Sequence, residues 1–205
     1  TVLNTIVAEA FCDACDELEA ADDFATAVHN LIKKNLSEHQ RVIFNGNGYS
    51  DEWVEEAERR GLPNIKSMVE AIPELTKEEN VVMFEKFGVF TKAELESRAE
   101  VKYENYAKTI NIEAKAMIDI AAKQIVPAVI KYAKSLADSV NAIKAAGIEE
   151  VSVETELLAE TSALLKETQV ALKNLIDTDA KACGMEDGAA QAAFYHDEVM
   201  KAMSE

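Results

Sequence analysis

The chain has 205 residues, 48% of them hydrophobic and 29% charged, and its formal net charge is −17. It can therefore bury a sizeable core, and its composition is not that of a disordered chain. The strong negative charge argues against direct binding to nucleic acid or to an anionic membrane, because both are polyanions.

The chain contains few helix-breaking residues, which favours an all-α fold. Only three prolines and seven glycines occur, and no apolar run approaches the length that spans a bilayer. Three cysteines are too few for a disulfide framework, which indicates a reducing, cytoplasmic setting. Residue 1 is Thr rather than Met, and helical periodicity already covers residues 1–18. We therefore expect residues 1–205 to form a single helical region of a larger protein.

Short helices are expected within residues 1–90, ahead of one much longer helix. Asp22 and Asp23 suit the positive start of the second helix, and Thr76 with Glu79 forms a capping-box pattern for the last one. Residues 41–44 (RVIF) are the one run with strand character, so we expect at most one short strand. The predicted helices cover about 1–18, 22–37, 50–60, 65–71 and 76–86, and Pro73 separates the last two.

A glycine-rich loop follows the RVIF run, and its glycines can hold positive φ. It matches a phosphate-binding loop only in part, because a third glycine is missing and Asp51 and Glu52 would repel an anion at the helix start. Two hypotheses stay open: a structural turn, and a loop that contacts a partner subunit or lines the rim of a neighbouring site. The candidate contact residues are Asn45, Gly46, Asn47, Gly48, Tyr49 and Trp53.

One very long helix is predicted for about residues 91–146. Thr91 and Glu94 form a capping box at its start, and Gly147 provides its stop. At 1.5 Å per residue its length would be roughly 80 Å. Pro127 should bend or locally loosen it, because proline lacks an N–H and crowds the carbonyl four residues earlier. Apolar residues recur at helical spacing throughout, namely Tyr103, Tyr106, Ile110, Ala114, Met117, Ala121, Ile125, Ala128, Tyr132, Leu136, Val140 and Ile143.

A partner helix at about 153–182, capped by Ser152, carries an apolar stripe with a period near 3.5 residues. This period is typical of a helix that lies antiparallel along a neighbour. A terminal helix follows at about 189–203. The predicted fold is thus an elongated helical bundle, with short helices and the NGNG loop in 1–90 and a long hairpin plus a terminal helix in 91–205.

The first turns of the long helix have no obvious partner. The antiparallel helix is too short to reach Tyr103, Tyr106 and Ile110. Helices near the N-terminus could cover these three residues. If they do not, the three residues are candidates for a contact surface.

No catalytic, cofactor-binding or metal-binding residue is predicted in the chain. Cys12 and Cys15 form a CxxC pattern inside a helix rather than at a helix start, where a redox pair is activated. The three histidines have no glutamate three positions before them, so the Glu-x-x-His pattern of di-iron bundles is absent. The carboxylates lie in solvated runs, and no isolated pair occupies an apolar setting.

Three stretches of the sequence resemble the type III glutamine synthetases. They are TVLNTIVAEAF at the start, RVIFNGNGYSDEWVEEAERRGLPN at 41–64, and NYAKTINIEAKAMIDIAAKQIVPAV at 105–129. The resemblance implies the C-terminal helical region of such an enzyme, without its catalytic domain. None of the family's catalytic residues maps onto a position of this chain.

The resemblance also implies what the parent enzyme does and binds. It would make glutamine from glutamate, ammonia and ATP, with Mg²⁺ or Mn²⁺, in a homo-oligomer of two stacked hexameric rings. This region would contact the catalytic domain of its own chain and neighbouring subunits. The alternative is a stand-alone helical or coiled-coil interaction module, for which RVIF followed by NGNGYSDEW would have little use.

Overall fold

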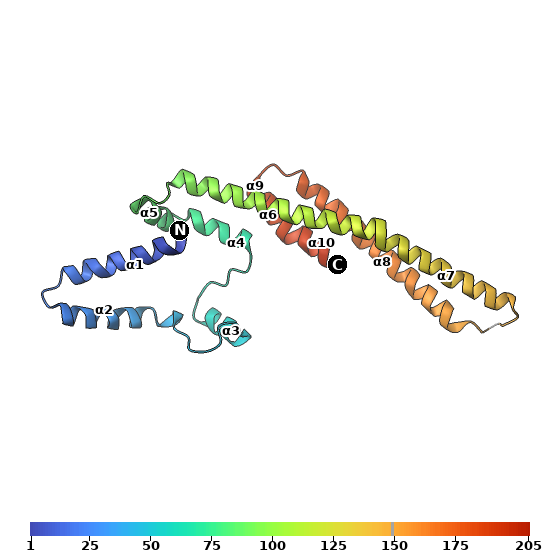
Figure 1. Ribbon diagram of the computed structural model, residues 1–205, viewed down its shortest axis with the longest axis horizontal. Helices are drawn as coiled ribbons and strands as arrows, with labels where there is room; N and C mark the ends of the chain where they lie inside the picture. Colours follow the sequence, from blue (N-terminus) through green and yellow to red (C-terminus); the bar gives the residue numbers. More distant parts are fainter. Residues whose placement is uncertain (149) are drawn as a thin grey trace. The chain divides into compact units, whose positions relative to one another are not determined.

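The computed structural model describes residues 1–148 and 150–205, and it is all-α over those residues, as predicted (Figure 1). It consists of two compact units, Thr1–Ala99 and Glu100–Glu205. The boundary between the units falls inside the long helix, which begins in the first unit and continues through the second.

The first unit contains seven short helical elements and the beginning of the long helix. Helices α1 and α2 form a hairpin, and Lys34 of α2 pairs with Glu17 of α1 at 2.8 Å. Asp23 caps α2 by accepting from the backbone N–H of Ala25 and Thr26, which confirms the acidic start. The elements are α1 (Val2–Glu19), α2 (Phe24–Glu38), η1 (Gln40–Val42), α3 (Asp51–Arg59), α4 (Met68–Ala71), η2 (Ile72–Thr76) and α5 (Glu78–Lys86).

At most one short strand is predicted for this unit, and residues 41–44 form none: the 3₁₀ helix η1 takes up Arg41 and Val42, so this run needs no pairing partner. One local prediction for this unit is wrong. Thr76 does not cap α5, because its hydroxyl donates to the carbonyl of Pro73 within η2. A capping box is instead present at the start of α4, between Ser67 and Glu70.

The core of the first unit lies where α5 turns into the long helix. Gly88 ends α5 with a positive φ of 60°. Thr91 and Glu94 then make the predicted capping box, with Thr91 N–H to Glu94 Oε2 at 2.8 Å and Glu94 N–H to Thr91 Oγ1 at 3.3 Å. Phe90 packs against the cluster that contains Leu95, and these two residues hold the positions of a hydrophobic staple. The cluster consists of Val81, Phe84 and Leu95, with Met83, Val89 and Phe90 against it.

The long helix is confirmed, with an irregularity where proline predicts one. It runs as α6 (Lys92–Ile120), a π-helical segment η3 (Ala121–Ile125) and α7 (Val126–Ala145). The N–H of Val126 donates to the carbonyl of Ala121, five residues back. Because Pro127 has no N–H to give, the helix is locally widened here rather than broken.

Helix α7 ends just before Gly147, the glycine that was predicted to stop it. Gly147 has φ 85°, its N–H donates to Lys144, and the N–H of Ile148 donates to Ile143. These two bonds define a Schellman motif. Helix α8 (Ser152–Cys183) then returns beside α7 in the antiparallel direction (Figure 1). Its N-cap is Val151, and Ser152 is the first helical residue.

The terminal segment folds back onto the hairpin and completes the core of the second unit. It consists of α9 (Gly188–Phe194), a π-helical segment η4 (Tyr195–Val199) and α10 (Met200–Ser204). Its buried side chains pack against both α6 and α8. The cluster comprises Ala107, Ile110, Ala114, Leu175, Ala182, Tyr195, Val199 and Ala202.

Candidate functional site

The NGNG loop is closed by an aromatic pair. Phe44, before the loop, stacks on Trp53 of α3 with ring centroids 4.3 Å apart and planes 25° apart. The guanidinium of Arg60 lies 5.7 Å from the centroid of the Trp53 ring. Such stacking stabilises a pair beyond the area it buries, so the loop is held by its own flanks.

The loop glycines do not hold positive φ, contrary to the prediction. Gly46 is required for space instead, since a Cβ there would lie 2.4 Å from Cζ of Phe44. Gly48 has nothing within 4 Å of the same position. The first glycine therefore serves the aromatic pair, and the second does not.

The tip of the loop is a turn that presents Tyr49 to solvent. Asn47 Oδ1 accepts from the N–H of Tyr49 at 3.1 Å, and the Ser50 hydroxyl donates to the carbonyl of Asn47 at 2.9 Å. The Tyr49 side chain is fully exposed, and Asn45 is also exposed. These are the loop residues that remain free to contact a partner.

A hollow of about 600 Å³ lies between the end of α2, the loop and α3. Glu56 binds two guanidinium groups in it: Arg59 donates through Nε at 2.7 Å and Nη2 at 2.6 Å, and Arg60 donates through Nε. Hydrogen bonds from Arg59, then from Arg60, lower the pKa of Glu56 and keep it ionised. We call this the arginine hollow; it is lined by Leu36, Gln40, Arg41, Ile43, Asn45, Glu56, Arg59 and Arg60.

The arginine hollow is not predicted above, although the sequence holds a signal for it. The chain has four arginines, and three of them occur within residues 41–60. Hydropathy patterning treats such residues as a solvated helix face. Only the fold brings residue 41 next to residues 59 and 60.

The terminal segment packs against the part of the long helix that holds its candidate contact residues. Ile110 is only 8% exposed and belongs to the core. Tyr106 packs against the same core, and its hydroxyl donates to Sδ of Met200 at 3.2 Å. Tyr103 is half-buried, and burial raises its pKa and that of Tyr106. Within the second unit, the end of α8 reaches Asn111, and η4 and α10 cover this part of α6 together with it.

A polar cluster joins three elements inside this core. Asn111 Nδ2 donates to Oδ1 of Asp179 at 2.9 Å and to the hydroxyl of Tyr195 at 2.6 Å. Cys183 Sγ lies 3.4 Å from the same hydroxyl. Burial first, then the bond to Cys183 and the charge of Asp179, raise the pKa of Tyr195 far above its ordinary value. The cluster pairs its buried groups internally and leaves no aimed nucleophile or base.

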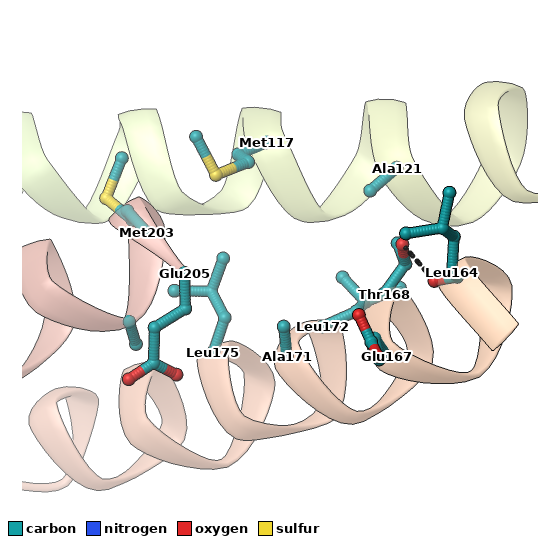
Figure 2. A pocket seen from close by; sticks show the side chains of 11 residues that line it. Met117, Ala121, Leu164, Glu167, Thr168, Ala171, Leu172, Leu175, Met203 and Glu205 are labelled. Carbon is teal, nitrogen blue, oxygen red and sulfur yellow. Dashed lines mark hydrogen bonds between the residues drawn. The ribbon is translucent and has the colours of Figure 1, made fainter.

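An apolar groove of about 350 Å³ opens where α10 ends against α6 and α8 (Figure 2). Met117 of α6 and Met203 of α10 line one side, and Leu164, Leu172 and Leu175 of α8 line the other. Glu167, Thr168 and Glu205 are its polar lining residues. The groove offers aliphatic contact and no grouping suited to catalysis.

Neither metal ligands nor a membrane span is found in the described part of the chain. Among residues 1–148 and 150–205, no three His, Cys, Asp or Glu side chains come together in a group that could hold a metal ion. No helix of those residues is both long and apolar enough to cross a bilayer.

The family described as the glutamine synthetase C-terminal domain matches residues 27–144, more than half of the chain. The chain belongs to this family. The matched residues contain the NGNG loop, the arginine hollow and nearly all of the long helix. The relationship to type III glutamine synthetases expected from the sequence is confirmed.

Three curated relatives of this chain are glutamine synthetases, each from a different organism. The chain is 35% identical over 187 residues to a glutamine synthetase of Butyrivibrio fibrisolvens, covering 91% of this chain and 27% of that protein. It is 40% identical over 145 residues to a type-3 glutamine synthetase of Dictyostelium discoideum, covering 69% of this chain and 20% of the relative. A glutamine synthetase of Bacteroides fragilis is 28% identical over 180 residues, covering 85% of this chain and 25% of the relative. The chain thus spans about a fifth to a quarter of the relatives it matches.

Proposed function

We propose that this chain is the C-terminal assembly region of a type III glutamine synthetase and has no catalytic site of its own. The observation that carries the proposal is the match to the C-terminal domain family combined with the small share of each relative that the chain spans. The parent makes glutamine from glutamate, ammonia and ATP, through γ-glutamyl phosphate, with Mg²⁺ or Mn²⁺. Its catalytic residues lie outside these 205 residues.

The residues described here do not fit the parent's metal ions. Mg²⁺ and Mn²⁺ are held by several oxygen ligands brought to one point, and no such group occurs in residues 1–148 and 150–205. No step of the reaction is therefore assigned to side chains of this chain. Its contribution is through surfaces that other parts of the enzyme contact.

The best-supported contact surface is the outward side of α6. Ile112 is 68% exposed, and Val101 and Ile120 are also exposed, although the opposite side of the same helix is already buried in the core. We call Val101, Ile112, Ala116 and Ile120 the outer stripe. Exposed aliphatic residues in a row mark interaction surfaces. We assign it to the parent's own catalytic domain or a neighbouring subunit, in a homo-oligomer of two stacked hexameric rings in the cytoplasm.

Deleting the region from the full-length parent tests the proposal. The shortened enzyme should sediment as an oligomer of fewer subunits than the intact enzyme, and the 205-residue chain alone should give no γ-glutamyl transfer with added Mn²⁺ and ATP. An unchanged number of subunits in the shortened enzyme would contradict the assembly role. Turnover by the isolated chain, lost on mutation within it, would contradict the absence of a catalytic site.

A stand-alone helical interaction module is the alternative function. A strand at residues 41–44 would have counted against such a module, and that strand is absent. The family match therefore favours the enzyme region without help from the strand. A natural protein that ends at both boundaries of these 205 residues would favour the module.

A further inference from the structure

Three of the four arginines of this chain gather at one place. Against 38 aspartates and glutamates in the chain, Arg41, Arg59 and Arg60 line the arginine hollow. Its one acidic lining residue is Glu56, so the lining carries a net charge of +2 (three guanidinium groups less one carboxylate). A cationic hollow on a chain of net charge −17 concentrates anions locally, against the field of the rest of the molecule.

Glu56 positions two of these groups rather than cancelling the hollow's charge. It accepts from Nε and Nη2 of Arg59 and from Nε of Arg60. Arg60 Nη1 also donates to the carbonyls of Ile43 at 2.8 Å and Arg41 at 3.3 Å. These bonds orient the forks and leave Nη1 of Arg59 and Nη2 of Arg60 unused among the described residues.

Three other residues of the lining have side-chain N–H donors that no described residue accepts. The side chains of Gln40, Arg41 and Asn45 make no hydrogen bond or ion pair with any residue in 1–148 or 150–205. Arg41 alone offers five N–H donors. Leu36 and Ile43 supply an exposed aliphatic wall beside them. Surplus donors, positive charge and an apolar wall together suit a ligand with an oxyanion and a short carbon part.

We propose that the arginine hollow binds a small-molecule oxyanion, carried by a phosphate or a carboxylate group. The Arg41 guanidinium, with all its donors unused, matches both groups through paired N–H···O bonds, which single ammonium groups cannot form, and Nη1 of Arg59 and Nη2 of Arg60 add further donors. The volume of about 600 Å³ lies within the range of small-molecule sites. This site is separate from the assembly role, and the proposal does not depend on that role.

Titration of the 205-residue chain with inorganic phosphate, AMP and glutarate, at constant ionic strength, tests the site. Trp53 is the one tryptophan, and Arg60 lies against it, so its fluorescence reports binding beside the loop. We expect saturable binding of at least one probe. Binding of phosphate and AMP without glutarate would identify a phosphorylated ligand, and the reverse would identify a carboxylate.

One arginine variant tests the site, and a second variant serves as its control. Arg41→Gln should weaken binding about tenfold or more, because it removes a charge-assisted donor. It has no partner to lose, so circular dichroism should show an unchanged fold. Arg98→Gln removes the fourth arginine, which lies over the Phe90 ring at 4.3 Å and outside the hollow, and should leave the affinity unchanged. Absence of saturable binding by all three probes, or equal loss in both variants, would overturn the proposal.

Discussion

The side-chain amide of Asn111 donates a 2.9 Å hydrogen bond to Asp179, and this bond joins the middle of α6 to the end of α8. Asp179 is only 5% exposed, and its other partner is the Tyr195 hydroxyl at 3.4 Å. Burying an ionised carboxylate lowers the free energy of unfolding by several kcal/mol unless hydrogen bonds compensate for the lost water. The Asn111–Asp179 bond therefore holds α6 against α8, and the Tyr195 hydroxyl, bonded to both, ties the terminal segment to them.

Asn111→Ala should destabilise the second unit by about 2–3 kcal/mol, because Asp179 loses its shorter bond while staying buried. The free energy of unfolding from urea titration measures this. Asn105→Ala, at an exposed asparagine of the same helix, should change it by only a few tenths, about the level of surface substitutions. Equal effects of the two variants would show that the buried bond contributes nothing.

Tyr195 should make the stability fall at alkaline pH. Its pKa is raised in the folded state, mainly by burial, so the unfolded chain loses this proton first. The stabilisation is complete below the unfolded value of about 10 and is lost as pH rises above it. Urea midpoints measured from neutral to strongly alkaline pH should fall less steeply in Tyr195→Phe than in the wild type. Tyr49→Phe, at a fully exposed tyrosine, should keep the wild-type slope; identical slopes in all three would contradict the prediction.

The predictable part of this fold is the part governed by local sequence. Apolar residues at helical spacing, the Thr91–Glu94 box and Gly147 are signals within a few residues of one another, and each is confirmed. The return of η4 onto Ile110 is not local, because it depends on burial shared among three elements. The arginine hollow was not predicted for the same reason, because it brings together residues that are not neighbours in the sequence. Residues 41–44, where at most one short strand was expected, form none, because three β-favouring residues do not make a strand without a partner.

Gly46→Ala should disturb the loop, because the new Cβ would fall 2.4 Å from Cζ of Phe44 and displace its ring from Trp53. We expect a shift in Trp53 fluorescence and a loss of about 1–2 kcal/mol, typical of overpacking. Gly48→Ala is the matched control, since nothing lies within 4 Å of that position. In the full-length parent, Gly46→Val and Trp53→Ala should impair assembly or activity. Wild-type behaviour of both would mean that the loop serves only its own unit.

Pro127→Ala should stabilise the long helix. The variant restores an N–H and lets Ala121–Ile125 adopt regular i→i−4 bonding in place of the π-helical segment. Proline costs about 3 kcal/mol in a regular helix interior, and the π segment already relieves part of that, so we expect a gain of about 1–2 kcal/mol. Slower amide hydrogen exchange at residues 121–128 should accompany the gain. Ser135→Ala, an exposed change in α7, should alter neither quantity appreciably; a Pro127→Ala variant no more stable than this control would contradict the prediction.

The outer stripe should make the isolated chain self-associate, and salt should strengthen the association. Val101, Ile112 and Ile120 are exposed, so contact between two copies would bury aliphatic surface. Each copy carries a net charge of −17, and the resulting repulsion is screened as the ionic strength rises. Sedimentation equilibrium at low and high salt should therefore show a higher average mass at high salt.

Serine substitutions identify the surface responsible. Ile112→Ser with Ile120→Ser removes two aliphatic groups without changing the charge, and should lower the mass at high salt towards that of a monomer. Because both side chains are exposed, the thermal midpoint should change little. Val170→Ser removes an exposed aliphatic side chain from α8, outside the stripe, and should keep the wild-type mass. A strict monomer at high protein concentration in both salts would show that η4 and α10 already cover the apolar surface that matters. Equal loss of association in the stripe and Val170→Ser variants would place the contact elsewhere on the second unit.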